Sequence, residues 1–587
     1  MAKHLFGPSL TALMLASGCA TPAPESAPPG GAAGVPVATG DCAALGAAGI
    51  GWPDPTMRIL SAKPVAAGAT IDTGQGGKSP PLPAHCEVDG ILAERTGQDG
   101  QSYAIRFKMR LPADWNRRFL FQGGGGTNGE IGNAVGMVTP GAPPALAQGF
   151  AVISQDSGHS NPIFADPAKG GAVAFGFDAQ ARADYGHASL KRSYDAARAI
   201  LTRFYGGDPA HSYFVGCSKG GQEGMAFAQR YPEAFDGIVA AAPGFSLPKA
   251  AVQEAWDTRT FAAVVRPAGG APMSFERLAD SFSDADLGLA RDAVLAACDV
   301  DDGLKDGIVG AFAQCTTARV RPQFEARQCK AGKTADCLSA AQIGALETSF
   351  AGARTSRGEP LYASFPWDSG MADPGWRIWK IGFPAQGGRP AAPAINVAMG
   401  AASLATIFST PPRLLPPGPQ GGFDYQLGYD FDRDAKAIFA TGPGFPRSAW
   451  DDIGMRSPDL RRFQAHGGKM IVPQGVSDPV FSINDTLAWW GEVDARSGGR
   501  ASSFVRVFPV PGMGHCAGGP ATDQFNALDA LVRWVEQGQA PDRIVATAGP
   551  ASPWPGRTRP LCPYPLVARP AAPGEALEKA EGFVCRR

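Results

Sequence analysis

Apolar runs and amphipathic segments alternate along the first half of the chain. Strand character is expected at 103–111, 118–122, 150–154 and 235–242, and helical character at 186–205 and after residue 218 as far as 231. In 186–205 apolar residues recur every three or four positions, which is typical of an amphipathic helix, whereas 235–242 is apolar throughout, as buried parallel strands are. This alternation of strand and helix predicts an α/β sheet.

The alternation stops after residue 243 and resumes at 469. The intervening residues contain many prolines, two loops bounded by cysteines, and the tryptophans Trp256, Trp367, Trp376, Trp379 and Trp450. Two further strands are then expected, at 469–474 and 504–508. The simplest account is an α/β core made of 42–245 and 461–587, with 246–460 inserted as a large lid after the strand that follows Ser218.

The N-terminus predicts export. Lys3 and His4 precede an apolar run at 5–16 that is too short to span a bilayer, and small residues follow it up to Cys19. These residues are similar to a bacterial lipoprotein cleavage site, which predicts an acylated Cys19 and a secreted, periplasmic or outer-membrane protein; ordinary signal cleavage nearby is the alternative. The Pro-, Ala- and Gly-rich residues 20–41 are expected to form a flexible linker, so any membrane anchoring would be through Cys19 alone.

Composition and charge exclude one class of function. The chain of 587 residues has 44% hydrophobic residues and a formal net charge of −1, from 53 Lys+Arg against 54 Asp+Glu. No basic run of the kind that holds a phosphate backbone is present, so nucleic-acid binding is not expected.

Cysteine counting also favours an oxidising compartment. The chain has 11 cysteines, and setting Cys19 aside leaves an even number. Local spacing predicts four disulfides: Cys42–Cys86, Cys298–Cys315, Cys329–Cys337 and Cys562–Cys585. Cys217 and Cys516 then remain, far apart in sequence.

The first stretch with catalytic potential is Gly216-Cys-Ser218-Lys-Gly220, between an apolar run and a helix. Gly-x-Ser-x-Gly in this context predicts a nucleophile elbow, in which the serine stands on a strained turn at the edge of an α/β-hydrolase sheet. The short pattern alone is weak in a chain with 76 glycines, and an ordinary turn is the alternative.

Two further residues complete the order Ser, Asp, His that this fold requires. Asp478 follows the strand expected at 469–474, and His515 lies in the loop after the strand expected at 504–508. His515 would accept the Ser218 proton, and Asp478 would hold the imidazole tautomer. Asp485 is a nearby alternative for the acid.

The glycine run at 123–126 follows an early strand. Backbone N–H groups of such a run can face a developing oxyanion, which predicts Gly124 and Gly125 as donors together with the N–H of Lys219, the residue after the nucleophile. A plain flexible turn is the alternative. Thr127 and Asn128, beside the run, are candidates for shaping the acyl pocket.

Cys217 and Cys516 flank the predicted nucleophile and histidine. If Ser218 and His515 meet, these two cysteines come close, and a disulfide between them would restrict both catalytic groups. Gly-Cys-Ser-x-Gly-Gly, with His-Cys-x-Gly-Gly downstream and a long insertion between them, resembles the tannase and feruloyl esterase family, which includes mono(2-hydroxyethyl) terephthalate hydrolases. The resemblance extends from about residue 42 onward.

The resemblance also implies a structural calcium site at the start of the lid. Residues 298–308 place closely spaced aspartates and glycines between apolar positions. The family's calcium loop implies carboxylate ligands from Asp299, Asp302 and Asp306 and backbone oxygens from Leu304 and Ile308, in keeping with the oxygen ligands that calcium prefers. An acidic surface turn is the alternative.

Relatives cleave esters of gallate, ferulate or terephthalate, so the resemblance implies a small aromatic ester as substrate. Candidate pocket residues in the lid are Phe365, Trp367, Trp376 and Trp379. Tryptophans at such spacing belong to the core of a lid as often as to its pocket. A lid arginine holds the free carboxylate in terephthalate half-ester hydrolases, but the corresponding region near 396–399 has none; Arg377 and Arg413 are possible substitutes. A lipase, a peptidase and a non-catalytic binding protein on the same scaffold are the remaining alternatives.

Overall fold

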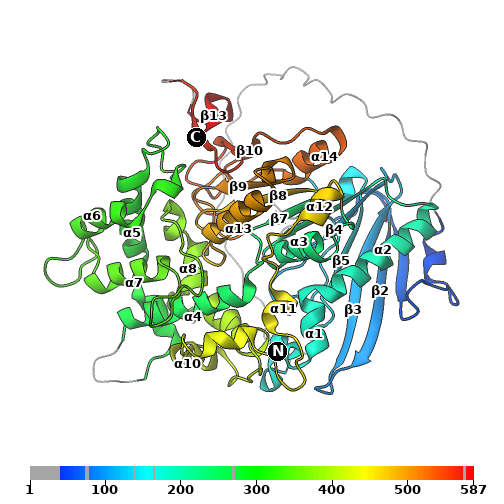
Figure 1. Cartoon of the computed structure of the whole chain (residues 1–587), viewed down its shortest axis with the longest axis horizontal. Coiled ribbons are helices and arrows are strands. Elements are labelled where there is room, and N and C mark those ends of the chain that lie inside the picture. Colours follow the sequence, from blue (N-terminus) through cyan, green and yellow to red (C-terminus); the bar gives the residue numbers. More distant parts are fainter. Residues whose placement is uncertain (1–39, 73–77, 138–140, 163–165, 267–271, 573–576) are drawn as a thin grey trace.

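The computed structural model describes residues 40–72, 78–137, 141–162, 166–266, 272–572 and 577–587 (Figure 1). The predicted signal at 1–19, with Cys19, and nearly all of the predicted linker lie outside these ranges. Within them, no helix combines the length and the apolar character needed to cross a bilayer.

A nine-stranded mixed sheet forms the centre of the molecule, in the order β1-β2-β3-β5-β4-β6-β7-β8-β9. The six strands from β5 to β9 in this order are parallel, and β1, β2 and β3 add an antiparallel extension beside β5. The strands are β1 (Arg58–Val65), β2 (His85–Thr96), β3 (Ser102–Pro112), β4 (Arg118–Gln122), β5 (Ala151–Gln155), β6 (His211–Cys217), β7 (Gly237–Ala241), β8 (Lys469–Gly475) and β9 (Val505–Val510).

Alternate residues of the central strands enter two different cores. In β4, Phe119 and Phe121 pack with α2 (Ser189–Tyr205), α3 (Lys219–Arg230) and α13 (Ile483–Arg496), whereas Leu120 packs with α14 (Ala527–Gln537) on the opposite face. Because successive strand side chains point to opposite faces, a fully apolar strand such as β4 must be covered by helices on both sides. The sheet is therefore the middle layer of three.

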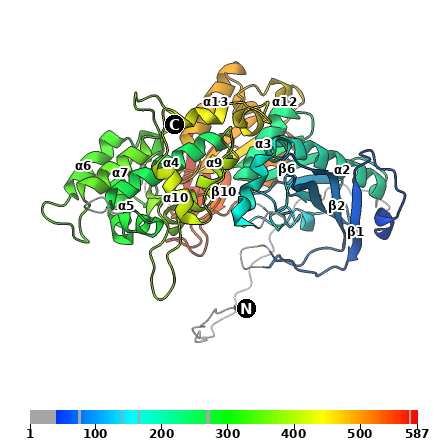
Figure 2. The same ribbon diagram turned by 90° about the horizontal axis from the view of Figure 1, so that it is seen from below.

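Between β7 and β8 the chain adds helices and contributes no strand to this sheet. In Figures 1 and 2 the helices α5, α6 and α7 of this segment lie at the end of the molecule opposite β1 and β2. Its helices are α4 (Leu247–Val264), α5 (Asp284–Cys298), α6 (Thr317–Ala326), α7 (Ala340–Phe350), α8 (Pro374–Lys380), α9 (Ala402–Thr406), α10 (Pro419–Leu427), α11 (Ala449–Ile453) and α12 (Arg461–Ala465). The residues assigned to a lid, 246–460, contain all of them except α12.

Several elements were not expected from the sequence. These are the edge strand β1 and its neighbour β2, the short helix α1 (Ala179–Ala183) before α2, and two C-terminal hairpins. The hairpins are formed by β10 (Ile544–Thr547) with β11 (Thr558–Leu561) and by β12 (Val567–Pro570) with β13 (Phe583–Arg586). The edge strand β1 is largely exposed or half-buried, so its sequence lacks the continuous apolar character of the central strands.

All five predicted disulfides are present, which confirms the four pairings inferred from spacing and the fifth, Cys217–Cys516, inferred from the positions of its cysteines beside Ser218 and His515. They are Cys42–Cys86, Cys217–Cys516, Cys298–Cys315, Cys329–Cys337 and Cys562–Cys585. Such a set is typical of a protein that matures in an oxidising compartment.

Candidate active site

Ser218 stands on a tight turn between β6 and α3. Its backbone has φ 65° and ψ −121°, in the positive-φ region that costs a non-glycine residue free energy. The flanking glycines make the turn possible, because a Cβ on Gly216 would lie 2.5 Å from the Gly220 backbone, and a Cβ on Gly220 would lie 2.6 Å from the Gly124 carbonyl oxygen. The turn has the geometry predicted for a nucleophile elbow.

A chain of hydrogen bonds connects Ser218, His515 and Asp478. His515 Nε2 is 2.8 Å from Ser218 Oγ, and His515 Nδ1 is 2.9 Å from Asp478 Oδ2. The other oxygen of Asp478 accepts the backbone N–H groups of Val480 and Phe481, at 2.8 and 3.1 Å. These two bonds fix the carboxylate, so a single Asp478 oxygen is directed at the imidazole.

The alternative acid, Asp485, lies elsewhere. It is in the first turn of α13, and its carboxylate accepts from Arg456 Nε at 2.7 Å. Asp368 of the lid segment instead supports the site: its Oδ2 accepts the N–H of Gly512 and the hydroxyl of Ser477, at 2.7 and 2.8 Å. Asp368 therefore ties together the loops that carry His515 and Asp478, a role that the sequence did not indicate.

The Cys217–Cys516 disulfide directly joins the serine turn to the histidine loop. The two Cα atoms are 6.1 Å apart although 299 positions separate the cysteines in sequence. Cys516 has φ 65°, so the residue after His515 also has a backbone that few side chains tolerate. The two strained turns are held against one another covalently.

The glycine loop lies beside Ser218, but only part of the predicted oxyanion set is available. The N–H of Gly124 donates to Glu223 Oε2 at 2.9 Å, so it is engaged and the prediction of Gly124 as an oxyanion donor is not retained. No hydrogen bond from the N–H of Gly125 or Lys219 is found within the described residues. Gly125 and Lys219 remain as the candidate donor pair.

Glu223, on α3, holds the glycine loop in place through hydrogen bonds. Its fully buried carboxylate accepts Lys219 Nζ at 2.9 Å and Asn128 Nδ2 at 2.9 Å in addition to Gly124. Asn128 therefore faces Glu223 and does not shape the acyl pocket as predicted. Burial lowers the pKa of the Lys219 ammonium, while the Glu223 carboxylate opposes that effect.

We expect Glu223→Gln to reduce kcat for ester hydrolysis about 10- to 100-fold with little change in KM, because the glycine loop loses a charged acceptor that orients it. The matched variant Lys219→Met removes the buried ion pair but leaves Glu223 bound to Gly124 and Asn128. Steady-state kinetics below both unfolding temperatures separate the two. Equal losses of kcat in the two variants would mean that Glu223 serves only to neutralise Lys219.

Ser218 opens into a cavity with aromatic and apolar walls. Its lining combines the glycine loop, α4, the turn around Met399 and the loop after Asp478: Gly126, Thr127, Tyr185, Ser218, Lys219, Leu247, Ala251, Glu254, Trp379, Met399, Gly400, Ser403, Phe408, Val480 and Phe481. The rings of Trp379 and Phe481 meet the His515 imidazole edge-on, each at 5.3 Å. The lining residues thus place aromatic side chains next to Ser218 and His515.

Only some of the predicted pocket residues line the cavity. Trp379 and Thr127 line the cavity, whereas Phe365, Trp367 and Trp376 are buried in the core of the helical segment. Tyr185, Leu247, Glu254, Ser403, Phe408 and Phe481 line the cavity but were not identified from the sequence, because they come from four separate elements without a common motif.

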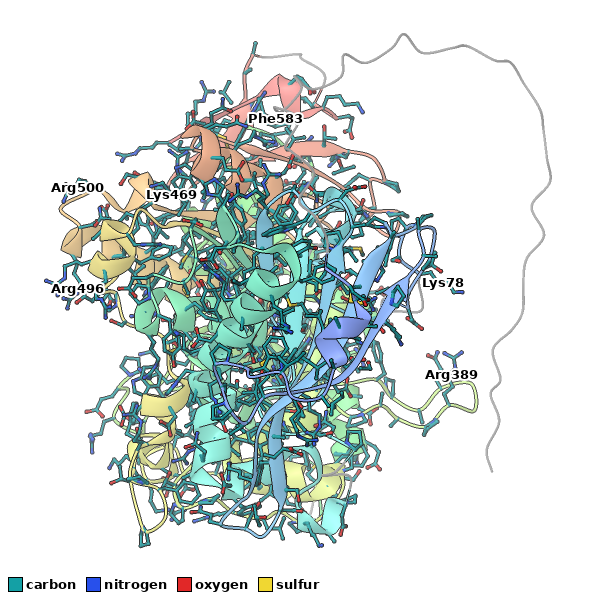
Figure 3. The ribbon with its side chains drawn as sticks, turned by 90° about the vertical axis from the view of Figure 1, so that its right-hand side faces the viewer. Lys78, Arg389, Lys469, Arg496, Arg500 and Phe583 are labelled. Atoms are coloured by element: carbon teal, nitrogen blue, oxygen red, sulfur yellow. A yellow bond between two sulfur atoms is a disulfide. The ribbon has the colours of Figure 1, made fainter. Side chains whose placement is uncertain are left out.

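No arginine is among the residues that line this cavity. Arg377 is buried in α8 and donates to the carbonyl oxygens of Phe282 and Ala279, and Arg413 is exposed to solvent. Arg389 lies on a loop that projects from the body of the molecule (Figure 3). Neither proposed substitute for a carboxylate-binding arginine is at the site.

The acidic loop at 299–308 holds its carboxylates mainly on its own backbone. Asp299 accepts the N–H groups of Asp306 and Gly307, and Asp302 accepts that of Leu304. Burial raises the pKa of Asp302 to about 7, with a further contribution from the neighbouring Asp306. Within the described residues, no three His, Cys, Asp or Glu side chains are grouped closely enough to hold a metal ion by themselves.

The loop also contacts the C-terminal hairpins. Asp306 Oδ2 accepts from Arg559 at 2.6 Å, and Arg557 donates to the Asp306 carbonyl oxygen at 3.1 Å. A large cavity lies between this loop and strands β11 to β13, but Ser218, Asp478 and His515 are not among its lining residues. The candidate active site is the smaller cavity, because it is lined by Ser218, whose hydroxyl contacts His515.

Comparison with known sequences gives a consistent assignment. The family model described as tannase and feruloyl esterase matches residues 86–586. A mono(2-hydroxyethyl) terephthalate hydrolase of Piscinibacter sakaiensis is 43% identical over 526 residues, covering 86% of this chain and 85% of the relative. A probable feruloyl esterase of Arthroderma benhamiae is 27% identical over 521 residues, covering 86% of each chain.

Solved structures show the same fold. Feruloyl esterase B from Aspergillus oryzae superposes with a TM-score of 0.68 at 22% identity, covering 91% of this chain and 97% of the other. Tannin acyl hydrolase from Aspergillus niger gives a TM-score of 0.65 at 20% identity, covering 91% and 92%. The predicted α/β-hydrolase type of fold is confirmed. The chain belongs to the tannase and feruloyl esterase family, a family of carboxylic ester hydrolases.

Proposed function

We propose that the protein is an exported serine esterase that hydrolyses esters of aromatic carboxylic acids through an acyl-enzyme on Ser218. The observation that carries this proposal is the continuous hydrogen-bonded chain from Ser218 Oγ through His515 to Asp478, beside a cavity with aromatic walls. A non-catalytic role is disfavoured, because all three groups are in bonding distance and Ser218 is held in a strained conformation.

In this mechanism Ser218 Oγ attacks the ester carbonyl carbon while its proton passes to His515 Nε2. The tetrahedral intermediate collapses, and His515 returns that proton to the departing alcohol. His515 then deprotonates a water that attacks the acyl-enzyme, and the acid leaves as Ser218 regains its proton. Asp478 keeps the imidazole oriented and stabilises its charged form throughout.

The oxyanion of each tetrahedral intermediate would be stabilised by the N–H groups of Gly125 and Lys219. Their position at the glycine loop and at the N-terminus of α3 supports this role, since helix N-termini favour negative charge. Glu223 would act as a positioning residue that keeps the glycine loop in place.

For the substrate, the cavity favours an uncharged aromatic acyl group. Its walls include Trp379, Phe408 and Phe481, and no arginine lines it to pair with a second carboxylate. Feruloyl- and galloyl-type esters fit these conditions. A terephthalate half-ester is the second candidate, favoured by the 43% identity to a relative named for that activity.

The test is hydrolysis of methyl ferulate, methyl gallate, mono(2-hydroxyethyl) terephthalate and p-nitrophenyl alkanoates by the wild type and Ser218→Ala. We expect turnover of the aromatic methyl esters by the wild type and none above background by the variant. A strong preference for long alkanoates would favour a lipase. Turnover by Ser218→Ala close to the wild-type rate would reject the proposed mechanism.

We also propose that the loop at 299–308 binds a structural calcium ion, with Asp299, Asp302 and Asp306 as carboxylate ligands and Leu304 and Ile308 as carbonyl ligands. Two of the three carboxylates support this: Asp299 and Asp302 are buried and form no ion pair within the described residues, whereas Asp306 is paired with Arg559 and would have to be shared with the cation. A bound cation would neutralise them, and it would stiffen the junction of the loop with Arg557 and Arg559.

Removal of calcium by EDTA is therefore expected to lower Tm by several degrees in the wild type, and added calcium should restore it. Asp302→Asn should lose this response, whereas Asp301→Asn, which alters a neighbouring aspartate paired with Arg319, should keep it. Thermal unfolding with and without chelator is the measurement. Protein that stays metal-free in calcium-containing buffer, with an unchanged Tm, contradicts the proposal.

Export is proposed from the N-terminal sequence and the five disulfides. Acylation of Cys19 would tether the enzyme to a membrane through the linker at 20–41. Mass spectrometry of the mature N-terminus distinguishes a lipidated Cys19 from cleavage at another residue.

A further inference from the structure

Glu254 is a buried acid in the wall of the cavity that contains Ser218. It lies on α4, is 6% exposed, and lines the cavity together with Ser403 and Phe408. Within the described parts of the chain, its carboxyl makes no hydrogen bond and no ion pair. The group is thus nearly removed from bulk water and has an unfilled hydrogen-bonding capacity next to the nucleophile.

The space for this carboxyl comes from a glycine on the opposite wall. A Cβ on Gly400 would lie 1.8 Å from Glu254 Oε2, so any larger residue there would displace the acid. Gly400 is itself a cavity residue, in the wide helical turn Asn396–Ala401. The carboxyl therefore packs directly against Gly400, a neighbour that offers it no side chain.

The charged groups around Glu254 are already paired with others. Lys380 Nζ binds Asp257 Oδ2, one turn along α4 from Glu254, and Lys219 Nζ binds Glu223. Among the hydroxyl groups of the cavity lining, Tyr185 Oη donates to the Gly126 carbonyl oxygen. Burial raises the pKa of Glu254 to about 8, and the attraction of Lys380 only partly offsets it. At neutral pH the group is accordingly a neutral carboxyl, both a donor and an acceptor.

A neutral, buried carboxyl without a hydrogen-bond partner does not stabilise the fold. Burying a polar group without a hydrogen-bond partner is unfavourable, and a leucine of similar size would fill the same volume without that cost. Residues that lower the stability of the folded protein occur preferentially at sites where a ligand supplies the missing hydrogen bond.

We propose that the Glu254 carboxyl hydrogen-bonds a hydroxyl group on the ring of an aromatic acyl substrate, and so selects hydroxylated acyl groups over unsubstituted ones. This inference rests on the proposed esterase function and deepens it. Glu254 is a specificity residue in this role, because it touches substrate at a distance from the scissile bond and takes no part in proton transfer at Ser218.

The test compares methyl 4-hydroxycinnamate with methyl cinnamate and methyl 4-hydroxybenzoate with methyl benzoate, two pairs that differ only in the hydroxyl. In the wild type, kcat/KM should favour the hydroxylated ester of at least one pair about tenfold, as one buried hydrogen bond would give. Glu254→Leu should bring that ratio close to one, whereas Glu254→Gln, which keeps a neutral donor and acceptor, should retain most of it.

Two further readouts separate this role from a structural one. Glu254→Leu should have a Tm equal to or above that of the wild type, because it replaces a buried carboxyl that has no hydrogen-bond partner with an apolar side chain of similar size. For methyl 4-carboxycinnamate, wild-type kcat/KM relative to that of Glu254→Gln should fall between pH 7 and pH 9, as Glu254 ionises and repels the substrate carboxylate.

Equal hydroxyl preference in the wild type and Glu254→Leu for both pairs would overturn the inference and leave the esterase function standing. If Glu254→Leu does not fold, the pH dependence of the wild type against Glu254→Gln decides, and identical profiles overturn it. A different result would reject the proposed esterase function: the wild type would hydrolyse none of these esters, or Ser218→Ala would hydrolyse them equally well.

Discussion

Asp478→Asn should lower kcat for aromatic ester hydrolysis about 10⁴-fold. Asp478 Oδ2 accepts a hydrogen bond from the N–H group at His515 Nδ1. This leaves Nε2 unprotonated and able to accept a hydrogen bond from Ser218 Oγ. An asparagine at this position would donate to Nδ1 instead and move the imidazole proton to Nε2, where it blocks the transfer. The fold should be retained, because the asparagine oxygen can still accept the N–H groups of Val480 and Phe481.

The control is Asp485→Asn, seven positions along the chain. Asp485 pairs with Arg456 and contacts no member of the triad, so its loss should change kcat less than about twofold, although it removes a partly buried ion pair. Steady-state kinetics on methyl ferulate, with Tm recorded for each variant, provide the comparison. A similar loss of kcat in both variants, or full activity of Asp478→Asn, would show that Asp478 does not orient His515.

The second large effect is expected on removing the disulfide between the serine turn and the histidine loop. In Cys217→Ser/Cys516→Ser we expect stability to fall by about 5 kcal/mol, because a link across 299 residues restricts the unfolded chain strongly. We also expect kcat to fall about 10- to 100-fold, since two strained turns that must remain within hydrogen-bonding distance lose their covalent connection.

Cys329→Ser/Cys337→Ser is the matched control. That disulfide spans 8 positions in the helical segment, far along the chain from the triad, so its removal should cost about 2–3 kcal/mol and leave kcat unchanged. Denaturant unfolding gives the stabilities and initial rates give kcat. Unchanged kcat in the Cys217/Cys516 variant would mean that the surrounding loops alone hold Ser218 and His515 together.

The core of the fold could be predicted because its strands are covered on both faces. β4, β7 and β8 are almost fully buried, so their sequences are continuous apolar runs bounded by turns, and their limits agree with the predicted ones to within two residues. β1 and the C-terminal hairpins are short or partly exposed, and their patterns resemble those of ordinary loops. Edge elements of this kind gain their stability from tertiary pairing, which local sequence does not encode.

The catalytic residues could be predicted from the sequence, whereas most of the pocket residues could not. Ser218, Asp478 and His515 each follow a buried strand, and parallel strands bring their carboxyl ends to one edge of the sheet. Glu254 and Trp379 reach the cavity from helices whose mutual packing depends on the whole helical segment, so no local motif indicates them. Gly124 was assigned incorrectly for a similar reason: a glycine run predicts available N–H groups, but the buried acceptor Glu223 that takes one of them lies 99 positions away.

The most direct test of the central claim is to treat the enzyme with a stoichiometric amount of diethyl p-nitrophenyl phosphate, which phosphorylates activated serines, and to follow activity and covalent mass together. We predict one adduct per chain, on the peptide containing Ser218, with activity lost in proportion to labelling and no labelling of Asp478→Asn on the same time scale. Loss of activity with Ser218 unmodified, or full activity with Ser218 modified, would contradict the claim that Ser218 is the nucleophile.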